Sequence, residues 1–172
     1  FRVGNNFPYA DDLRLFGNHV HHVAHCGVHF WAAVDVKSKK RAFTRAEIKT
    51  GRILVKDNLV EKACQLGADC GAIKFSGGPS HKHVFRDVLV MGNTLRDTYG
   101  WTHVGEKRGL RWAGEGSVRR GMGGFGLYVD FASGIHAYRN IAHNNGYIGY
   151  HMYGFWRDGE MVYCNNVAAD NA

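Results

Sequence analysis

The sequence predicts an all-β solenoid, in which short repeated strands stack on one another, and three observations lead to this prediction. An alternation of apolar residues followed by asparagine recurs five times along the 172 residues. There are 23 glycines and only two prolines, which suits a chain with many turns. Apolar residues make up 45% of the chain, enough for a core. A unit this short cannot bury its apolar face alone, so the units are expected to stack.

The repeat has apolar residues five and three positions before an anchor asparagine and two positions after it. Around Asn140 these are Ile135, Ala137 and Ala142. The same pattern surrounds four other anchors: Asn18, Asn58, Asn93 and Asn166. Alternation with period two predicts a strand before each anchor. Asparagine tolerates left-handed backbone angles and can hydrogen-bond from one unit to the next, so we expect a corner at each anchor.

A second strand is predicted after most anchors, in the segments GVHFWAA, AIKFSG, GLYVDF and GYHMYG, which begin at Gly27, Ala72, Gly126 and Gly149. The anchors are 40, 35, 47 and 26 residues apart, and the longer intervals are expected to contain loops. The longest predicted loop is an insertion at about 97–123.

Alternation along the second strands predicts which side chains face outward. The inward residues are Val28, Phe30, Ile73, Phe75, Leu127, Val129, Tyr150 and Met152. The outward residues are His29, Trp31, Lys74, Ser76, Tyr128, Asp130, His151 and Tyr153. A solvated sheet face more often carries Thr, Ser, Lys and Glu. We therefore interpret this face as a groove whose aromatic rings stack on sugars, the alternative being packing pairs beneath a covering loop.

Three segments resemble the turns of right-handed parallel β-helix proteins, with the closest likeness to the parallel β-helix glycoside hydrolases. They are DCGAIKF at Asp69–Phe75, GLYVD at Gly126–Asp130 and RNIAHNNG at Arg139–Gly146, and the resemblance covers roughly residues 10 to 172. It implies a right-handed parallel β-helix. Pectate-lyase-like lyases, uronan epimerases, phage tailspikes and noncatalytic surface proteins share this fold, so the reaction stays open.

The resemblance implies that aspartates at such positions perform glycoside hydrolysis, which makes Asp69 and Asp130 the candidate carboxylates. Glycosidases use two carboxyl groups, about 5 Å apart when they retain and about 6.5–9.5 Å apart when they invert the anomeric configuration. A turn cap is the alternative role for Asp69.

A polysaccharide lyase acting on a uronic-acid polymer is the alternative reaction. It would take its base from Lys74, Tyr128 or His151. No acidic cluster resembles the calcium site of pectate lyases, so we expect no cofactor, with calcium as the alternative if the chain is a lyase.

Substrate contacts are expected mainly from aromatic and basic residues. The outward ones are His29, Trp31, Tyr128 and Tyr153, joined by Arg157 and by Trp101, Arg111 and Trp112 of the insertion. Arg and Trp together suit an anionic sugar chain or single-stranded nucleic acid. The alternative for the insertion is a solvated basic loop.

The formal net charge is +7 before the eleven histidines are counted, which favours anionic partners. We expect a polysaccharide, acidic polymers included, rather than nucleic acid. A noncatalytic glycan-binding or structural solenoid, of the adhesin or tailspike type, is the other alternative, and solenoid ends can associate with one another. The sequence contains no run of eighteen apolar residues, so we predict no membrane span.

The chain is interpreted as one domain, residues 1–172, of a larger or processed extracellular or periplasmic protein, because it begins at Phe1 in mid-pattern. Its cysteines form no CxxC pair, and buried free thiols are favoured over a Cys64–Cys70 bridge. The histidines from His19 to His29 span two strands and a corner, where alternate side chains point apart, so we expect no metal site.

Overall fold

The computed structural model describes residues 5–8, 10–32, 50–66, 69–76, 83–99, 124–153 and 160–171. Over these residues the chain is all β, with fifteen strands and no helix. The strands form three five-stranded sheets in which every pairing is parallel. The all-β prediction is therefore confirmed.

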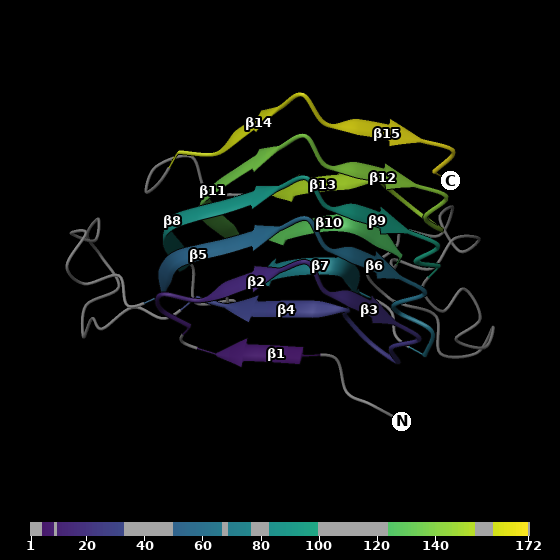
Figure 1. Ribbon diagram of the computed structural model, residues 1–172, viewed down its shortest axis with the longest axis horizontal. Coiled ribbons are helices and arrows are strands. Elements are labelled where there is room, and N and C mark those ends of the chain that lie inside the picture. The colour runs from purple at the N-terminus through teal and green to yellow at the C-terminus, as the bar shows by residue number, and fades with distance from the viewer. Residues whose placement is uncertain are drawn as a thin grey trace, which may run out of the picture.

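The chain visits the three sheets in the same order five times. Sheet A consists of β1 (Asn5–Pro8), β4 (Val28–Trp31), β7 (Gly71–Ser76), β10 (Phe125–Asp130) and β13 (Tyr150–Tyr153). Sheet B consists of β2 (Arg14–Phe16), β5 (Gly51–Lys56), β8 (His83–Met91), β11 (Ala132–Tyr138) and β14 (Val162–Cys164). Sheet C consists of β3 (His19–His21), β6 (Leu59–Glu61), β9 (Thr94–Arg96), β12 (Ile141–His143) and β15 (Val167–Ala169). Successive repeats lie side by side from β1 to β15, an arrangement compatible with a parallel β-helix (Figure 1).

The five anchor asparagines form a hydrogen-bonded ladder at the corner between sheets B and C. The Nδ2 atoms of Asn18, Asn58, Asn93 and Asn140 each donate to the Oδ1 atom of the next anchor at 2.9 Å. Each of these asparagines also donates its backbone N–H to the same Oδ1 atom, at 2.9–3.0 Å. The predicted bonding between units is therefore confirmed.

The left-handed backbone angle at this corner belongs to the residue before the anchor and not to the anchor itself. These residues are Gly17, Asp57, Gly92, Arg139 and Asn165, with φ between 53° and 66°. The expectation of left-handed anchors is thus wrong: the chain turns one residue earlier, and the anchor contributes its N–H and side chain to the ladder. A second set of left-handed residues lies four positions after the anchors: His22, Lys62, Asp97, Asn144 and Asp170.

The core lies between the sheets and is made by the inward residues that alternation predicts. Phe30 and Phe75, paired across β4 and β7, are fully buried and stack with ring centroids 4.7 Å apart. Ile53 and Val55 of sheet B and Leu95 of sheet C close the same interior. Burial of these side chains fixes which face of each strand points outward.

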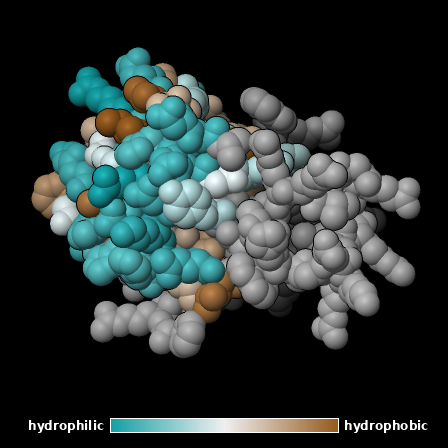
Figure 2. Space-filling view, turned by 90° about the vertical axis from the view of Figure 1, so that its right-hand side faces the viewer, coloured by the Kyte–Doolittle hydropathy of each residue, from teal (hydrophilic) through white to brown (hydrophobic). Residues whose placement is uncertain are grey.

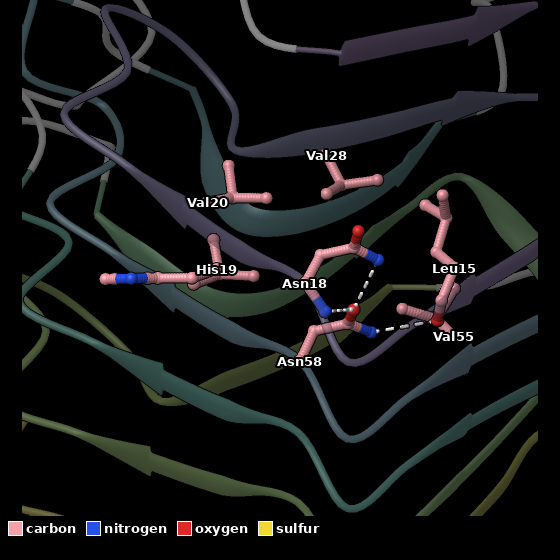
Figure 3. Close-up of a pocket in the computed structure, with 8 residues that line it drawn as sticks. Leu15, Asn18, His19, Val20, Val28, Val55 and Asn58 are labelled. Carbon is pink, nitrogen blue, oxygen red and sulfur yellow. Dashed lines mark hydrogen bonds between the residues drawn. The ribbon is translucent and has the colours of Figure 1, made fainter.

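A pocket of about 230 Å³ opens inside the first two repeats, at the end of the stack near β2 and β3 (Figure 3). It is lined by Leu15, Asn18, His19, Val20, Val28, Val55, Asn58 and Val60. These are corner and mostly inward-facing residues, so the pocket is separate from the outward face of sheet A.

The cysteines correct one prediction. Cys64 and Cys70 form a disulfide and are not the buried free thiols that the sequence predicts, because the turn between β6 and β7 brings their Cα atoms to 5.8 Å. Cys26 is a buried free thiol beside this disulfide, and burial raises its pKa to about 11. Cys164 is free and exposed.

Candidate functional site on the outer face of sheet A

The parallel register of sheet A gathers the predicted outward residues into two rows. One row contains His29, Lys74, Tyr128 and His151, and the other contains Trp31, Ser76, Asp130 and Tyr153. Neighbouring strands lie about 4.8 Å apart, so each side chain meets its counterparts on the adjacent repeats. We call these eight residues the outer rows.

Lys74 is the centre of the outer rows and binds both candidate carboxylates. It is 4% exposed, and its Nζ atom lies 3.1 Å from Asp69 Oδ2 and 3.4 Å from Asp130 Oδ2. The Nζ atom also donates to the Asp69 backbone carbonyl at 2.9 Å and lies 4.4 Å from the centroid of the Tyr128 ring. A buried ammonium needs such partners, because desolvation of an unpaired charge is costly.

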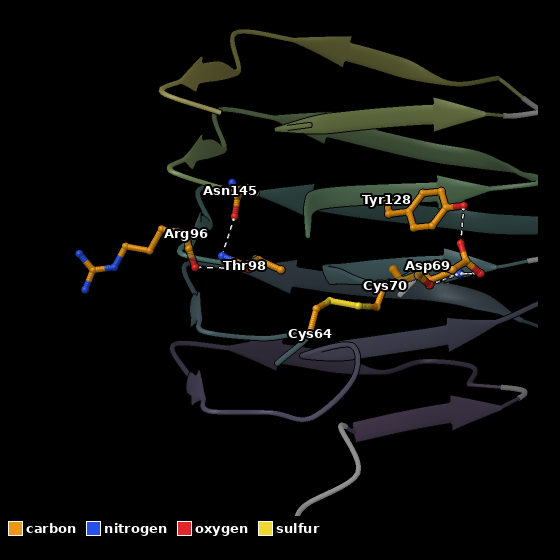
Figure 4. The surroundings of a disulfide bond; sticks show 8 residues. Cys64, Asp69, Cys70, Arg96, Thr98, Tyr128 and Asn145 are labelled. Carbon is orange, nitrogen blue, oxygen red and sulfur yellow. Dashed lines mark hydrogen bonds and ion pairs between the residues drawn. A yellow bond between two sulfur atoms is a disulfide. The ribbon is translucent and has the colours of Figure 1, made fainter. Parts of the chain in front are cut away.

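Asp69 reaches Lys74 from outside the rows, from the turn that precedes β7. Its backbone is left-handed, with φ 56°, and the neighbouring disulfide closes this turn (Figure 4). Its carboxylate accepts a hydrogen bond from the Tyr128 hydroxyl at 2.8 Å and is 54% exposed, whereas the Asp130 side chain is 17% exposed. The two carboxylates therefore share a cation but differ in their access to solvent.

Tyr128 stays protonated in this setting. Burial, followed by its hydrogen bond to Asp69, raises the pKa of the Tyr128 hydroxyl well above its usual range. The hydroxyl therefore acts as a donor to Asp69, and this weighs against the interpretation of Tyr128 as a lyase base.

The two histidines of the rows are held in the neutral form at neutral pH. Burial, with the nearby charge of Lys74 as the next cause, lowers the pKa of His29 to about 4. Burial also lowers the pKa of His151, against the opposing effect of Asp130 and Asp69. His29 Nε2 lies 2.6 Å from Ser76 Oγ, a contact that the sequence pattern does not reveal. The ring of His151 lies edge-on to Tyr128 at 5.2 Å.

Exposed aromatic rings flank the charged centre. Trp31 is 37% exposed and its ring lies 4.8 Å from that of His29. Tyr153 is 51% exposed and meets the ring of Phe131 edge-on at 4.7 Å. These two rings lie three repeats apart on the same row, and rings at both ends of a polar stretch can stack on a sugar chain that runs across the strands.

Four predicted substrate-binding residues, Trp101, Arg111, Trp112 and Arg157, lie outside the described residues, as does the insertion from residue 100 to 123. The structure brings together Asp69, Lys74, Asp130, Tyr128 and His151 directly, and places His29, Trp31 and Tyr153 beside them on the same face.

The sequence pattern missed a second charged cluster, on sheet C. Glu61 accepts hydrogen bonds from Arg96 Nε at 2.8 Å and contacts His19 Nε2 at 3.0 Å. The hydrogen bond with His19 and those from Arg96 lower the pKa of Glu61. A signal for this cluster is present in the sequence, because Glu61 and Arg96, three residues after the anchors Asn58 and Asn93, have opposite charges.

The described part of the side seen in Figure 2 is mostly hydrophilic.

Within the described ranges, no group of three or more His, Cys, Asp or Glu residues is arranged to hold a metal ion. The same ranges contain no helix with the length and hydrophobicity needed to cross a lipid bilayer.

Comparisons of the chain with protein-family models, with curated proteins and with solved structures found no match. Its function therefore has to be inferred from the site itself.

Proposed function

We propose that the chain is a right-handed parallel β-helix protein that binds a polysaccharide across the outer rows and hydrolyses it with Asp69 and Asp130. The observation that carries this proposal is the contact of both carboxylates with the Nζ atom of one buried lysine, Lys74. The handedness is supported by the repeated visit to three parallel sheets, because about 98% of such crossover connections are right-handed.

The spacing of the carboxylates favours retention of configuration. Because each Oδ2 atom lies within 3.4 Å of the same nitrogen, the two oxygens are at most about 6.5 Å apart. Inverting enzymes use separations of about 6.5–9.5 Å to admit a water molecule, whereas retaining enzymes use about 5–5.5 Å. The proposed mechanism is therefore a double displacement through a covalent glycosyl-enzyme intermediate.

The surroundings of the two carboxylates assign their roles. Asp69 accepts hydrogen bonds from Lys74 and Tyr128, and donors to the ionised form favour a nucleophile. Asp130 is more buried and lies farther from Lys74 Nζ, at 3.4 Å, and we assign it the role of the acid that protonates the leaving oxygen. Asp130 would then take a proton from the water that releases the sugar.

The charge of the outer face favours a neutral sugar. The described groups are one cation, Lys74, two carboxyl groups, and the neutral histidines His29 and His151. With Asp130 as the protonated acid, Lys74 and Asp69 balance each other, so this set offers a uronic-acid polymer no excess of positive charge despite the net charge of +7 on the whole chain. Elimination needs cations around a uronate group, so the local charge supports hydrolysis over a lyase reaction.

The test is mass spectrometry of products after incubation with neutral and acidic polysaccharides. Hydrolysis yields products that contain an added water molecule. We expect these from a neutral polymer and expect their rate to fall by at least about 10³-fold in Asp69→Asn and Asp130→Asn. Asp170→Asn, an exposed aspartate on the last repeat, is the matched control and should keep full activity. If Asp130→Asn does not fold, the exposed Asp69 still tests the proposal.

Two outcomes would contradict hydrolysis. Unsaturated products without added water would establish a lyase, with Lys74 or His151 as the base. No product from any polymer, with thermal melting showing a folded chain, would establish a noncatalytic binding or structural protein.

A further inference from the structure

Ser76 and His29 form a nucleophile–base pair beside the two carboxylates. His29 of β4 and Ser76 of β7 both face outward, and Nε2 and Oγ lie 2.6 Å apart. That distance falls in the range of about 2.6–3.2 Å at which a histidine activates a serine hydroxyl. Ser76 pairs in register with Trp31 on one side and Asp130 on the other, so its contact with His29 joins the two outer rows next to Asp130.

His29 is neutral at physiological pH and can accept a proton, although its lowered pKa makes it a weaker base than an unperturbed imidazole. A neutral imidazole has one nitrogen free to accept a proton, and burial together with the charge of Lys74 keeps His29 neutral at physiological pH. When Nδ1 holds the ring proton, Nε2 accepts the hydrogen bond from the Ser76 hydroxyl.

We propose that Ser76 and His29 catalyse a second reaction, the hydrolysis of small O-acyl esters, of the acetyl class, on sugar hydroxyls. Ser76 is 2% exposed, so reaction at Oγ requires the surrounding side chains to move aside and admits at most a small acyl group, whereas the exposed Trp31 beside it offers a surface for the sugar. The identification of the alcohol as a sugar rests on the proposed glycan binding, but the acyl chemistry does not.

This ester hydrolysis needs only water as a co-reactant. The Ser76 hydroxyl transfers its proton to His29 Nε2 as Oγ bonds to the acyl carbon. The tetrahedral intermediate collapses by breaking the bond to the sugar oxygen, which takes the proton from His29. Water then adds to the acyl-serine with His29 as base, and the carboxylic acid and the free serine are released.

The experiment measures acylation of Ser76 directly. The protein is incubated with p-nitrophenyl acetate and, separately, with a small sulfonyl fluoride, and peptides are mapped by mass spectrometry. We expect ester hydrolysis and a sulfonyl adduct on Ser76, both abolished in Ser76→Ala and reduced by about 10²–10⁴-fold in His29→Gln. Ser133→Ala removes an equally buried serine from sheet B and should leave both signals unchanged.

A hydrogen bond that only satisfies the buried Ser76 hydroxyl would give no adduct on Ser76, or ester hydrolysis that persists in Ser76→Ala, and either result overturns the proposal. Adduct mapping on the native chain decides the matter even if Ser76→Ala does not fold. The outcome is independent of glycoside hydrolysis, because Asp69→Asn should stop polysaccharide cleavage while leaving the sulfonyl adduct in place.

Discussion

At the scale of single residues, the fold depends on buried asparagines that bond in three directions. Asn93 accepts from the N–H and Nδ2 of Asn58 and donates to Asn140 Oδ1 and to the carbonyl of Val55. Its side chain is therefore fully satisfied although the residue is inaccessible to solvent. Loss of a buried partner costs the full desolvation of the groups left behind, so this ladder is more important to stability than its few atoms suggest.

Asn93→Ala should therefore destabilise the protein by about 3–5 kcal/mol, because it removes the side-chain acceptor of the buried Asn58 N–H and the side-chain donor to the Val55 carbonyl. Asn18→Ala, at the exposed end of the same ladder, should cost no more than about 1 kcal/mol. Urea denaturation of both variants measures the difference. Equal losses would show that the ladder does not contribute through burial.

The lowered pKa of His29 predicts that the folded chain becomes less stable as the pH falls. Its pKa is about 4 in the folded chain and about 6.5 when unfolded, so between these values the unfolded state binds a proton that the folded state does not. Stability from this group is present above pH 6.5 and is lost as the pH falls toward 4. The decrease in melting temperature from pH 7 to pH 4.5 should be smaller in His29→Gln than in the native chain. An unchanged decrease would place the acid sensitivity elsewhere.

At the scale of elements, strand register and one turn build the site together. The parallel register places Tyr128 beside Lys74, but Asp69 is brought in by the turn between β6 and β7. The disulfide closes that turn over a sequence separation of only 6 residues. The turn therefore determines where one of the two proposed catalytic carboxylates lies.

Replacement of both cysteines, Cys64→Ser with Cys70→Ser, should lower the free energy of unfolding by about 2 kcal/mol, the loop-closure entropy of so short a ring. Cys164→Ser, at an exposed free thiol, should change it by less than about 0.5 kcal/mol. Chemical denaturation of the three forms makes the comparison. If reduction of the native disulfide left the stability unchanged, the bridge would not be constraining this turn.

At the scale of the whole molecule, the positive net charge of the chain is not concentrated at the proposed site. The chain has a formal charge of +7, whereas the described groups around Lys74 have no excess of positive charge. Long-range attraction of acidic polymers is therefore expected to act through other parts of the surface and to be screened by salt.

Binding of a neutral polysaccharide should accordingly be unaffected by raising NaCl from about 0.05 to 0.5 M, while binding of an acidic polymer should weaken steeply. Trp31→Ala should reduce the affinity for the neutral polymer by about tenfold, since it removes a stacking ring. Affinity electrophoresis at both salt concentrations measures these effects. Salt-resistant binding of the acidic polymer would show that the site itself recognises anionic sugars.

The sequence by itself determined the anchors, the second strands and the side of each strand that faces the core. These features repeat locally, since alternation sorts Lys74 from Ile73 and each asparagine occupies one position in its unit. Only the tertiary structure decided that Lys74 lies between Asp69 and Asp130, that His29 meets Ser76, and that Cys64 pairs with Cys70. Such contacts depend on the register between distant strands and on the path of one turn, and a repeating pattern of side chains specifies neither.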